Sequence, residues 1–237
     1  MEEIVNQETI LVIGSGGREA TIVWKLRQSK MAGTIFVAPG NAGMVEFDRV
    51  DFAMLDGQPI KANETDKLIR FAKKQAVGLT IVGPEGPLCA GIVDEFRKAK
   101  LPIFGPNKAA AQMEGSKVFA KKIMAKCGVP TAPFQVFTDY DKALSYVVNC
   151  KLPMVIKADG LCSGKGVYIC HTLGEARDAL KELLVDMKFG AASTPVIVED
   201  FLIGQELSFM AFYDGLNIRS MIASQDHKQR FENDQGQ

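Results

Sequence analysis

The sequence lacks an excess of charge of either sign. Its 237 residues include 28 Lys and Arg against 28 Asp and Glu, so the formal net charge is zero. Without a basic surplus there is no electrostatic reason to expect nucleic acid or an anionic membrane as a partner. No apolar run reaches the roughly 18 residues of a membrane-spanning helix, so we expect no membrane segment.

Cysteine and histidine are also scarce, which excludes several kinds of site. The five cysteines are an odd number and none stands in a C-x-x-C pair, so neither a zinc site nor a disulfide framework is expected. The two histidines form no H-E-x-x-H motif and belong to no Ser-His-Asp order, so neither pattern of hydrolase is indicated. Unpaired thiols suit a reducing compartment, and we expect a cytoplasmic protein.

The first half of the chain does contain a clear alternation of short apolar runs with helical patterns. The apolar runs cover residues 10–13, 34–38, 79–82 and 102–104, and the helical patterns cover 17–30, 64–76 and 88–100. This order predicts an α/β fold with a doubly wound parallel sheet and helices on both faces. Each run ends in a turn-forming residue, and ligands of open parallel sheets bind at those carboxyl ends.

The pattern changes after residue 104. Asn107 and Ser116 are placed to cap two helices, and Gly128 is placed to end the second. A small α+β unit is expected next, followed by two alternating segments around Asp214-Gly215, which is a hairpin signal. The predicted elements are helices at 108–114, 117–127, 140–149 and 173–185, strands at 134–137 and 196–198, and the segments 206–213 and 217–223. We therefore divide the chain into residues 1–115, 116–195 and 196–237.

A glycine loop carrying lysines is the most informative motif. It reads Lys157-Ala-Asp-Gly160-Leu-Cys-Ser-Gly164-Lys165-Gly166 and joins two apolar runs. Glycines let backbone N–H groups approach an anion, and lysines add positive charge where phosphates would sit. A P-loop is excluded because the spacing is one residue short and a strand, not a helix, follows. The loop is predicted to be a hairpin tip folding over a nucleotide; the alternative is an ordinary glycine-rich turn.

A second glycine turn, Gly14-Ser-Gly16-Gly17, follows the first strand. It does not fit dinucleotide binding, because the third glycine position is Glu19 and the second strand does not end in an acidic residue. We favour a phosphate-bearing substrate there over NAD. Asn41 and Glu85 end neighbouring strands and are candidate contacts for hydroxyl or amine groups; the alternative for both is plain turn chemistry.

Acidic and basic residues near the end of the chain complete the candidate set. Glu199 follows a strand and is placed to read an adenine edge, with Glu206 available for ribose hydroxyls; the alternative is an acidic surface turn. Asp226 and Lys228 flank a histidine that has no discernible catalytic partner, and Lys228 is a candidate phosphate contact.

These motifs together resemble one family, glycinamide ribonucleotide synthetase, also called phosphoribosylamine–glycine ligase, of the ATP-grasp superfamily. Further segments that recur there in this order are Pro39-Gly-Asn-Ala-Gly43, Gly83-Pro-Glu85-Gly-Pro-Leu88, Phe104-Gly-Pro106, Ala111-Gln-Met-Glu-Gly-Ser-Lys117, Glu206-Leu-Ser-Phe209 and Gln225-Asp-His-Lys228. The resemblance implies a pre-ATP-grasp sheet domain, an ATP-grasp lid subdomain, and the first strands of an incomplete central subdomain.

The resemblance also implies a reaction and the residues that serve it. ATP would activate the carboxylate of glycine, and 5-phosphoribosylamine would attack the acyl phosphate. Lys157 and Lys165 are assigned to catalysis. The residues assigned to ATP are Lys117, Lys157, Gly160, Gly164, Lys165, Gly166, Glu199, Leu202 and Glu206. The residues assigned to phosphoribosylamine are Gly16, Gly17, Asn41, Glu85, Asp226 and Lys228.

Two departures from the family pattern qualify these assignments. The family's Gly-Arg-Glu-His-Ala becomes Glu19-Ala20-Thr21 here, which removes an imidazole on the substrate side. The family also continues past Asp-His-Lys with an Asn-Thr-Gly-Gly-Met-Gly segment and the ligands of Mg²⁺ or Mn²⁺, which we expect beyond residue 237, with no metal site in this chain. We therefore expect a truncated chain that binds ATP weakly without turnover, with an exposed sheet edge suited to self-association.

Two rival interpretations remain open from the sequence. One is another ATP-grasp ligase, such as a carboxylase subunit of purine synthesis or a peptide-type ligase, because no residue present reports glycine specificity. The other is a non-catalytic nucleotide-binding module.

Overall fold

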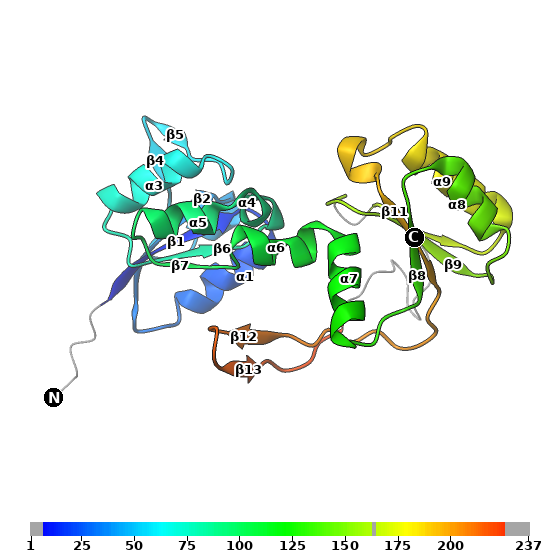
Figure 1. Ribbon diagram of the computed structural model, residues 1–237. Helices are drawn as coiled ribbons and strands as arrows, with labels where there is room; N and C mark the ends of the chain where they lie inside the picture. The colour runs from blue at the N-terminus through cyan, green and yellow to red at the C-terminus, as the bar shows by residue number, and fades with distance from the viewer. Residues whose placement is uncertain (1–6, 163–164, 226–237) are drawn as a thin grey trace. The chain divides into compact units, whose positions relative to one another are not determined.

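The computed structural model describes residues 7–162 and 165–225. The chain forms two compact units, Met1–Asp200 and Phe201–Gln237, and each is described by itself. Figure 1 shows the elements of both. No helix in the described part of the chain is long and apolar enough to cross a membrane.

The first unit begins with the predicted parallel sheet. Its strand order is β3-β2-β1-β6-β7. The strands are β1 (Glu8–Gly14), β2 (Ala32–Pro39), β3 (Val50–Phe52), β6 (Leu79–Val82) and β7 (Ile103–Phe104). Every pairing is parallel, with Leu11 opposite Phe36 on one side and Thr80 on the other. The sequence missed β3, because a three-residue edge strand with an aspartate at its centre carries little apolar signal.

Helices join these strands, and one prediction among them was wrong. The helices are α1 (Gly17–Leu26), α2 (Ala42–Val45), α3 (Thr65–Lys74), α4 (Glu85–Ala90) and α5 (Ile92–Lys98), and a small hairpin of β4 (Met54–Leu55) and β5 (Gln58–Pro59) precedes α3. The single helix predicted over 88–100 is two helices. Gly91, with φ of 101°, ends α4 in a left-handed conformation that other residues rarely adopt.

The alternation of side chains along β1 builds a core on each face of the sheet. Leu11 and Ile13 belong to one buried cluster, which includes Phe96 of α5. Ile10 and Val12 belong to another, which includes Val23 of α1. Because neighbouring side chains of a strand point to opposite faces, burial on both sides requires helices on both sides. The doubly wound arrangement is therefore confirmed.

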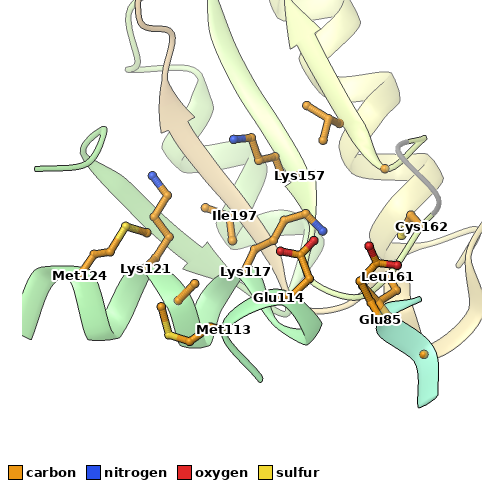
Figure 2. A pocket seen from close by; sticks show the side chains of 14 residues that line it. Glu85, Met113, Glu114, Lys117, Lys121, Met124, Lys157, Leu161, Cys162 and Ile197 are labelled. Carbon is orange, nitrogen blue, oxygen red and sulfur yellow. The ribbon is translucent and has the colours of Figure 1, made fainter. Parts of the chain in front are cut away.

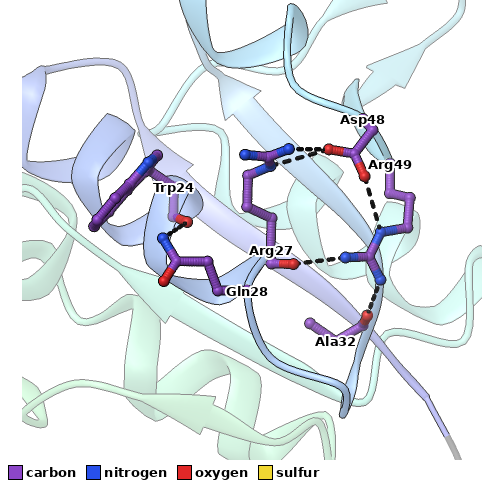
Figure 3. A network of polar contacts seen from close by, with 6 residues as sticks. All are labelled: Trp24, Arg27, Gln28, Ala32, Asp48 and Arg49. Carbon is purple, nitrogen blue, oxygen red and sulfur yellow. Dashed lines mark hydrogen bonds and ion pairs between the residues drawn. The ribbon is translucent and has the colours of Figure 1, made fainter.

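An arginine network fastens the end of α1 (Figure 3). Arg49 donates from Nη1 to the Ala32 carbonyl at 2.7 Å and from Nη2 to the Arg27 carbonyl at 2.6 Å, so it satisfies a carbonyl at the end of the helix. Arg27 pairs with Asp48, and that hydrogen bond lowers the pKa of the Asp48 carboxyl. The network ties the loop before β3 to α1.

Two capped helices follow the first sheet, as predicted. They are α6 (Lys108–Gly115) and α7 (Lys117–Cys127). Asn107 Oδ1 accepts from the Ala110 N–H at 2.8 Å, and Ser116 Oγ accepts from the Phe119 N–H at 3.0 Å. Gly128, with φ of 68°, ends α7.

The second sheet is antiparallel, in the order β10-β9-β11-β8. Its strands are β8 (Phe134–Phe137), β9 (Met154–Ala158), β10 (Val167–Cys170) and β11 (Val196–Asp200), and its helices are α8 (Tyr140–Val147), α9 (Leu173–Leu184) and a 3-10 turn (Gly190–Ser193). The predicted β9–β10 hairpin is confirmed. The strand β11 lies between β9 and β8, although the division predicted at residue 196 would separate it from both. Its partners are distant in sequence, so the local pattern gave no indication of them.

The second unit contains the predicted hairpin, with shorter strands. β12 (Ala211–Tyr213) and β13 (Ile218–Ser220) are antiparallel, with Phe212 opposite Arg219. Hydrogen bonds from the backbone and side chain of Asn217 and from the Leu216 N–H hold the turn, and they lower the pKa of the Asp214 carboxyl to about 2.

Candidate functional site

The alternation of residues in the second sheet gives it one core face and one polar face. Met154 and Ile156 of β9 and Val198 of β11 pack into a buried cluster with α8 and α9. The intervening residues, Lys157 and Glu199, therefore share the opposite face. Lys157 lies directly opposite Ile197, so Glu199 is its diagonal neighbour on that face.

Asp159, directly after β9, fastens the start of α7 to the glycine loop. Its carboxylate accepts from the Ser116 hydroxyl at 2.9 and 3.0 Å and from the Val118 N–H at 2.7 Å. The Lys117 ammonium donates to the carbonyls of Asp159 at 3.3 Å and Gly160 at 2.9 Å. An anionic cap at a helix N-terminus is favourable, and here it places Lys117 beside the loop.

A pocket of about 720 Å³ lies along this polar face. Its lining comes from α4, α6, α7, the glycine loop and the second sheet: Glu85, Gly86, Met113, Glu114, Lys117, Ala120, Lys121, Met124, Lys157, Leu161, Cys162, Gly166, Val167 and Ile197. Figure 2 shows lysine and apolar side chains together around it. The volume falls within the range of about 300–1,000 Å³ that is usual for small-molecule sites. The apolar side chains can pack against a flat aromatic ring of a ligand, and the lysine ammonium groups can pair with a string of anionic groups on the same ligand.

A buried ion-pair group stands at one side of the pocket. The Glu199 side chain is 5% exposed, and its Oε2 lies 2.5 Å from the Lys121 ammonium while its Oε1 pairs with Lys157. The Lys121 ammonium also donates to Thr131 Oγ1 at 2.7 Å and to the Ala132 carbonyl at 3.3 Å. The contact at Oε2 is an ion pair, since within the described residues that atom accepts no aligned hydrogen bond. Two ammonium groups thus share one carboxylate.

The structure brings several residues of the predicted ATP site together. Lys117 and Lys157 both line the pocket, and Gly166 lines it as well. Gly160 accepts from Lys117, and a side chain there would place its Cβ 2.7 Å from that of Ala192, so the close approach requires glycine. The Glu199 carboxylate is held by lysines, so its predicted contact with adenine stays a prediction.

Other predicted residues lie outside this pocket or outside the described residues. Lys165 is exposed and is not part of the lining described above; its backbone N–H donates to the Cys162 carbonyl at 2.9 Å. Leu202 and Glu206 belong to the second unit, where the Leu202 side chain is exposed. Gly164, Asp226 and Lys228 are outside the described residues. Their assigned roles stay predictions.

Sequence reasoning missed Lys121, which is the most buried lysine of this pocket, and the anchoring role of Asp159. Lys121 is four residues after Lys117, and residues at that spacing share a helix face. Once Lys117 had been assigned to the site, this spacing could have predicted that Lys121 faces the same pocket. Asp159 carried no such signal, because its partners on α7 are more than 40 residues away.

Four of the predicted substrate residues, Gly16, Gly17, Asn41 and Glu85, follow the carboxyl ends of strands of the first sheet, and Gly16 lines a second pocket there. Gly14, Ser15, Gly16, Glu19, Pro39, Ala62, Asn63, Pro84, Gly86, Pro87 and Ala90 line it. The Gly16 N–H donates to Glu19 Oε2 at 2.7 Å, so in this conformation it points at a buried carboxylate and not at a ligand. Gly17 has open space where a side chain would be. Glu19 therefore accepts from a backbone N–H that the sequence assigned to a phosphate, and the predicted substrate contacts stay predictions.

Asn41 and Glu85 are both engaged within the protein. Asn41 donates from Nδ2 to the Ser15 carbonyl at 2.8 Å and accepts from the Met44 N–H at 3.2 Å, which is the turn chemistry held open as the alternative. Glu85 accepts from Arg18 at 2.8 Å, and this hydrogen bond lowers the pKa of the Glu85 carboxyl. Glu85 also lines the lysine pocket.

The described residues offer no metal centre. Among them, no group of three or more His, Cys, Asp or Glu side chains could hold a metal ion. We therefore assign no step of any reaction to a metal held by these residues.

Comparison with known proteins places this geometry in a family. The sequence model of "Phosphoribosylglycinamide synthetase, N domain" matches residues 8–114, and that of "Phosphoribosylglycinamide synthetase, ATP-grasp (A) domain" matches residues 115–237. The phosphoribosylamine–glycine ligases of Pasteurella multocida and Haemophilus influenzae are 50% and 49% identical over 227 residues, which is 96% of this chain and 52% of each relative. The chain thus spans about half the length of the curated relatives it matches.

Solved structures agree with this result. The phosphoribosylamine–glycine ligase of Thermotoga maritima is similar with a TM-score of 0.74 and 30% identity, over 97% of this chain and 53% of that one. The N5-carboxyaminoimidazole synthase of Aspergillus clavatus, solved with ADP and 5-aminoimidazole ribonucleotide, has a TM-score of 0.66 at 16% identity, over 93% of this chain and 54% of that one. At that identity the likeness concerns the fold alone.

Proposed function

The chain belongs to the phosphoribosylglycinamide synthetase family, and from that premise we propose that it contributes the nucleotide pocket and the substrate edge of an ATP-dependent carboxylate–amine ligase. The reaction joins glycine to 5-phosphoribosylamine and yields glycinamide ribonucleotide, ADP and phosphate. The lysine-lined pocket takes ATP, and the carboxyl edge of the first sheet takes the ribose phosphate.

The proposed chemistry proceeds through an acyl phosphate. A carboxylate oxygen of glycine attacks the γ-phosphorus of ATP, and ADP leaves. The amine of phosphoribosylamine then attacks the acyl carbon, the C–O bond to phosphate breaks, and the nitrogen loses a proton. Both steps gather negative charge on phosphate oxygens, so fixed cations and correct placement are what the protein must supply.

One observation carries the proposal: Lys117, Lys121 and Lys157 surround one pocket beneath a glycine hairpin. Lys117 is fixed by its hydrogen bonds to the loop, and Lys157 stands on the sheet floor beside Ile197. The apolar part of the lining accommodates a base, and the ammonium groups of Lys117 and Lys157 neutralise a triphosphate. Relatives in this family are ligases by name, which agrees with this use of the pocket.

Glu85 and Gly86 support a meeting point between the two proposed sites. Both line the lysine pocket, and Gly86 also lines the pocket at the sheet edge. A segment shared by the two pockets is where an activated carboxylate and an amine would have to meet. We propose that the turn at the start of α4 adjoins the reacting groups.

We propose that Mg²⁺ or Mn²⁺ accompanies ATP in the ligase, supplying charge neutralisation at the phosphates. The described residues include no cluster that could hold such an ion, and the contacts that we propose from them to the phosphates are lysine and backbone contacts. The five free cysteines agree with work in a reducing cytoplasm.

The chain is expected to bind ATP at least tenfold more tightly than adenosine. Each charge-assisted hydrogen bond from lysine to phosphate is worth about 1.5–3 kcal/mol, and adenosine makes none of them. Isothermal titration with ATP, AMP and adenosine at two salt concentrations measures this difference. Equal affinities for ATP and adenosine, or no binding of either, would refute the proposed function.

We also propose that the second unit associates with a second copy of the chain. Phe209, Ile218 and Ile222 are strongly exposed there, with Ile222 at 92%. In the described part of the chain β12 and β13 form a sheet of only two strands, and such a sheet presents edges that pair readily. Sedimentation velocity over a concentration series should show a dimer that Ile218→Lys weakens. A monomer at every concentration would contradict this proposal.

A further inference from the structure

Two ammonium groups share the Glu199 carboxylate, yet their surroundings differ. The Lys121 side chain is 10% exposed, and its ammonium contacts Thr131, the Ala132 carbonyl and the ring of Phe134, whose centroid is 5.4 Å away. The Lys157 side chain is 27% exposed and reaches the pocket from the sheet floor. Lys121 is therefore anchored on several sides, and Lys157 is the partner with freedom to move.

The net charge of the group formed by Glu199, Lys121 and Lys157 affects how strongly it attracts an anionic ligand. Glu199 with one lysine is neutral, and Glu199 with both lysines carries one surplus positive charge. A buried carboxylate must keep a partner, because leaving it unpaired is costly. If Lys157 turns toward a phosphate, Glu199 can release it only when another cation remains in contact.

We propose that Lys121 is a positioning residue that holds and neutralises Glu199, so that Lys157 is free to turn its ammonium to the phosphates of a nucleotide. This inference rests on the proposed use of the pocket for ATP. Lys121 acts through Glu199 and not by touching the nucleotide. Without Lys121, Glu199 binds Lys157 as its sole cation and cancels the charge that the phosphates need.

The variant Lys121→Met should lower the affinity for ATP by about tenfold to a hundredfold, the range expected when one charged hydrogen bond to phosphate is lost. The affinity for adenosine should change little, because adenosine makes no use of the Lys157 ammonium. Lys121→Arg should retain most of the ATP affinity, since a guanidinium also neutralises Glu199. Lys122→Met, at an exposed position on the same helix, controls for the loss of one positive charge.

A double-variant cycle separates the positioning role from the alternatives. In a Glu199→Gln background no carboxylate holds Lys157, so adding Lys121→Met should leave the ratio of ATP to adenosine affinities unchanged. A further tenfold loss in that background would mean that Lys121 contacts the phosphates directly and would overturn the inference. The Lys121→Met, Glu199→Gln double variant buries neither charge, so it remains informative even where Lys121→Met alone does not fold.

The outcomes also distinguish this inference from the proposed function. If the wild-type chain does not prefer ATP over adenosine, the proposed function itself is refuted. A wild-type chain that prefers ATP, together with an Lys121→Met variant that binds ATP as wild type does, overturns the inference alone. Thermal unfolding of each variant shows whether a change in affinity reflects loss of fold.

Discussion

Replacing Lys157 with methionine is expected to lower the affinity of the chain for ATP by about 10- to 100-fold, which corresponds to one charge-assisted contact with phosphate. Lys157 lines the pocket and is the more exposed of the two lysines that share Glu199. Adenosine should bind nearly as before, because its ring is accommodated by the apolar lining. Isothermal titration with both ligands measures the two affinities separately.

The same variant is expected to keep its fold, because Glu199 retains Lys121 as a partner. A matched control is Lys151→Met, which removes an exposed lysine shortly before the same strand and should leave both affinities unchanged. If Lys157→Met weakened adenosine and ATP equally, the pocket would be responding to a change in shape, and the assignment of Lys157 to the phosphates would be wrong.

Replacing Gly14 with alanine is expected to lower the free energy of unfolding by about 2–5 kcal/mol, from backbone strain and overpacking together. Gly14 ends β1 with φ of 131°, a conformation that is essentially restricted to glycine. A Cβ there would lie 2.4 Å from Cγ of Glu19, so the buried side chain that accepts from the Gly16 N–H would have to move. Urea unfolding followed by circular dichroism measures the loss.

Gly17→Ala is the matched control for this prediction. Gly17 begins α1 three residues later, and a side chain there meets nothing within 4 Å. Alanine is the better helix former, so the control should be neutral or slightly stabilising. Equal losses from both substitutions would show that the sheet edge does not depend on the packing of Glu19 against Gly14.

Local signals are what made much of the fold predictable. Ser116 and Asn107 are helix caps followed by helical patterns, and the structure shows both side chains accepting from the expected N–H groups. The β9–β10 hairpin followed from two apolar runs joined by a glycine loop. In each case the information lies within a few residues of the feature, so one sequence suffices to recognise it.

The features that the sequence did not predict depend mostly on distant parts of the chain. The neighbours of β11 in the sheet are set by its pairing with β9 and β8, and no pattern around Val196 shows which strands these are. The short edge strand β3 owes its conformation to β2. Gly91 is different: its left-handed conformation is a local signal, and the apolar periodicity on either side of it concealed the break.

The residues of the candidate site also differ in how far the sequence predicted them. Lys157 was singled out by the glycine-loop motif and Lys117 by the family resemblance, and the structure brings both to one pocket. From the sequence, Glu19 was used only as evidence that the third glycine of a dinucleotide motif is absent. In the structure its carboxylate accepts a hydrogen bond from the Gly16 N–H, three residues earlier. Two lysines share Glu199 because α7 lies along the polar face of the second sheet. The local sequence of the helix or of the sheet does not predict that the two pack together.

A crystal structure of the chain with a non-hydrolysable ATP analogue tests the central claim most directly. The account predicts that the phosphates lie between Lys117 and Lys157 beneath the glycine hairpin, with Glu199 still paired to Lys121. A nucleotide bound elsewhere on the chain, or one in this pocket whose phosphates point away from both lysines, would contradict it.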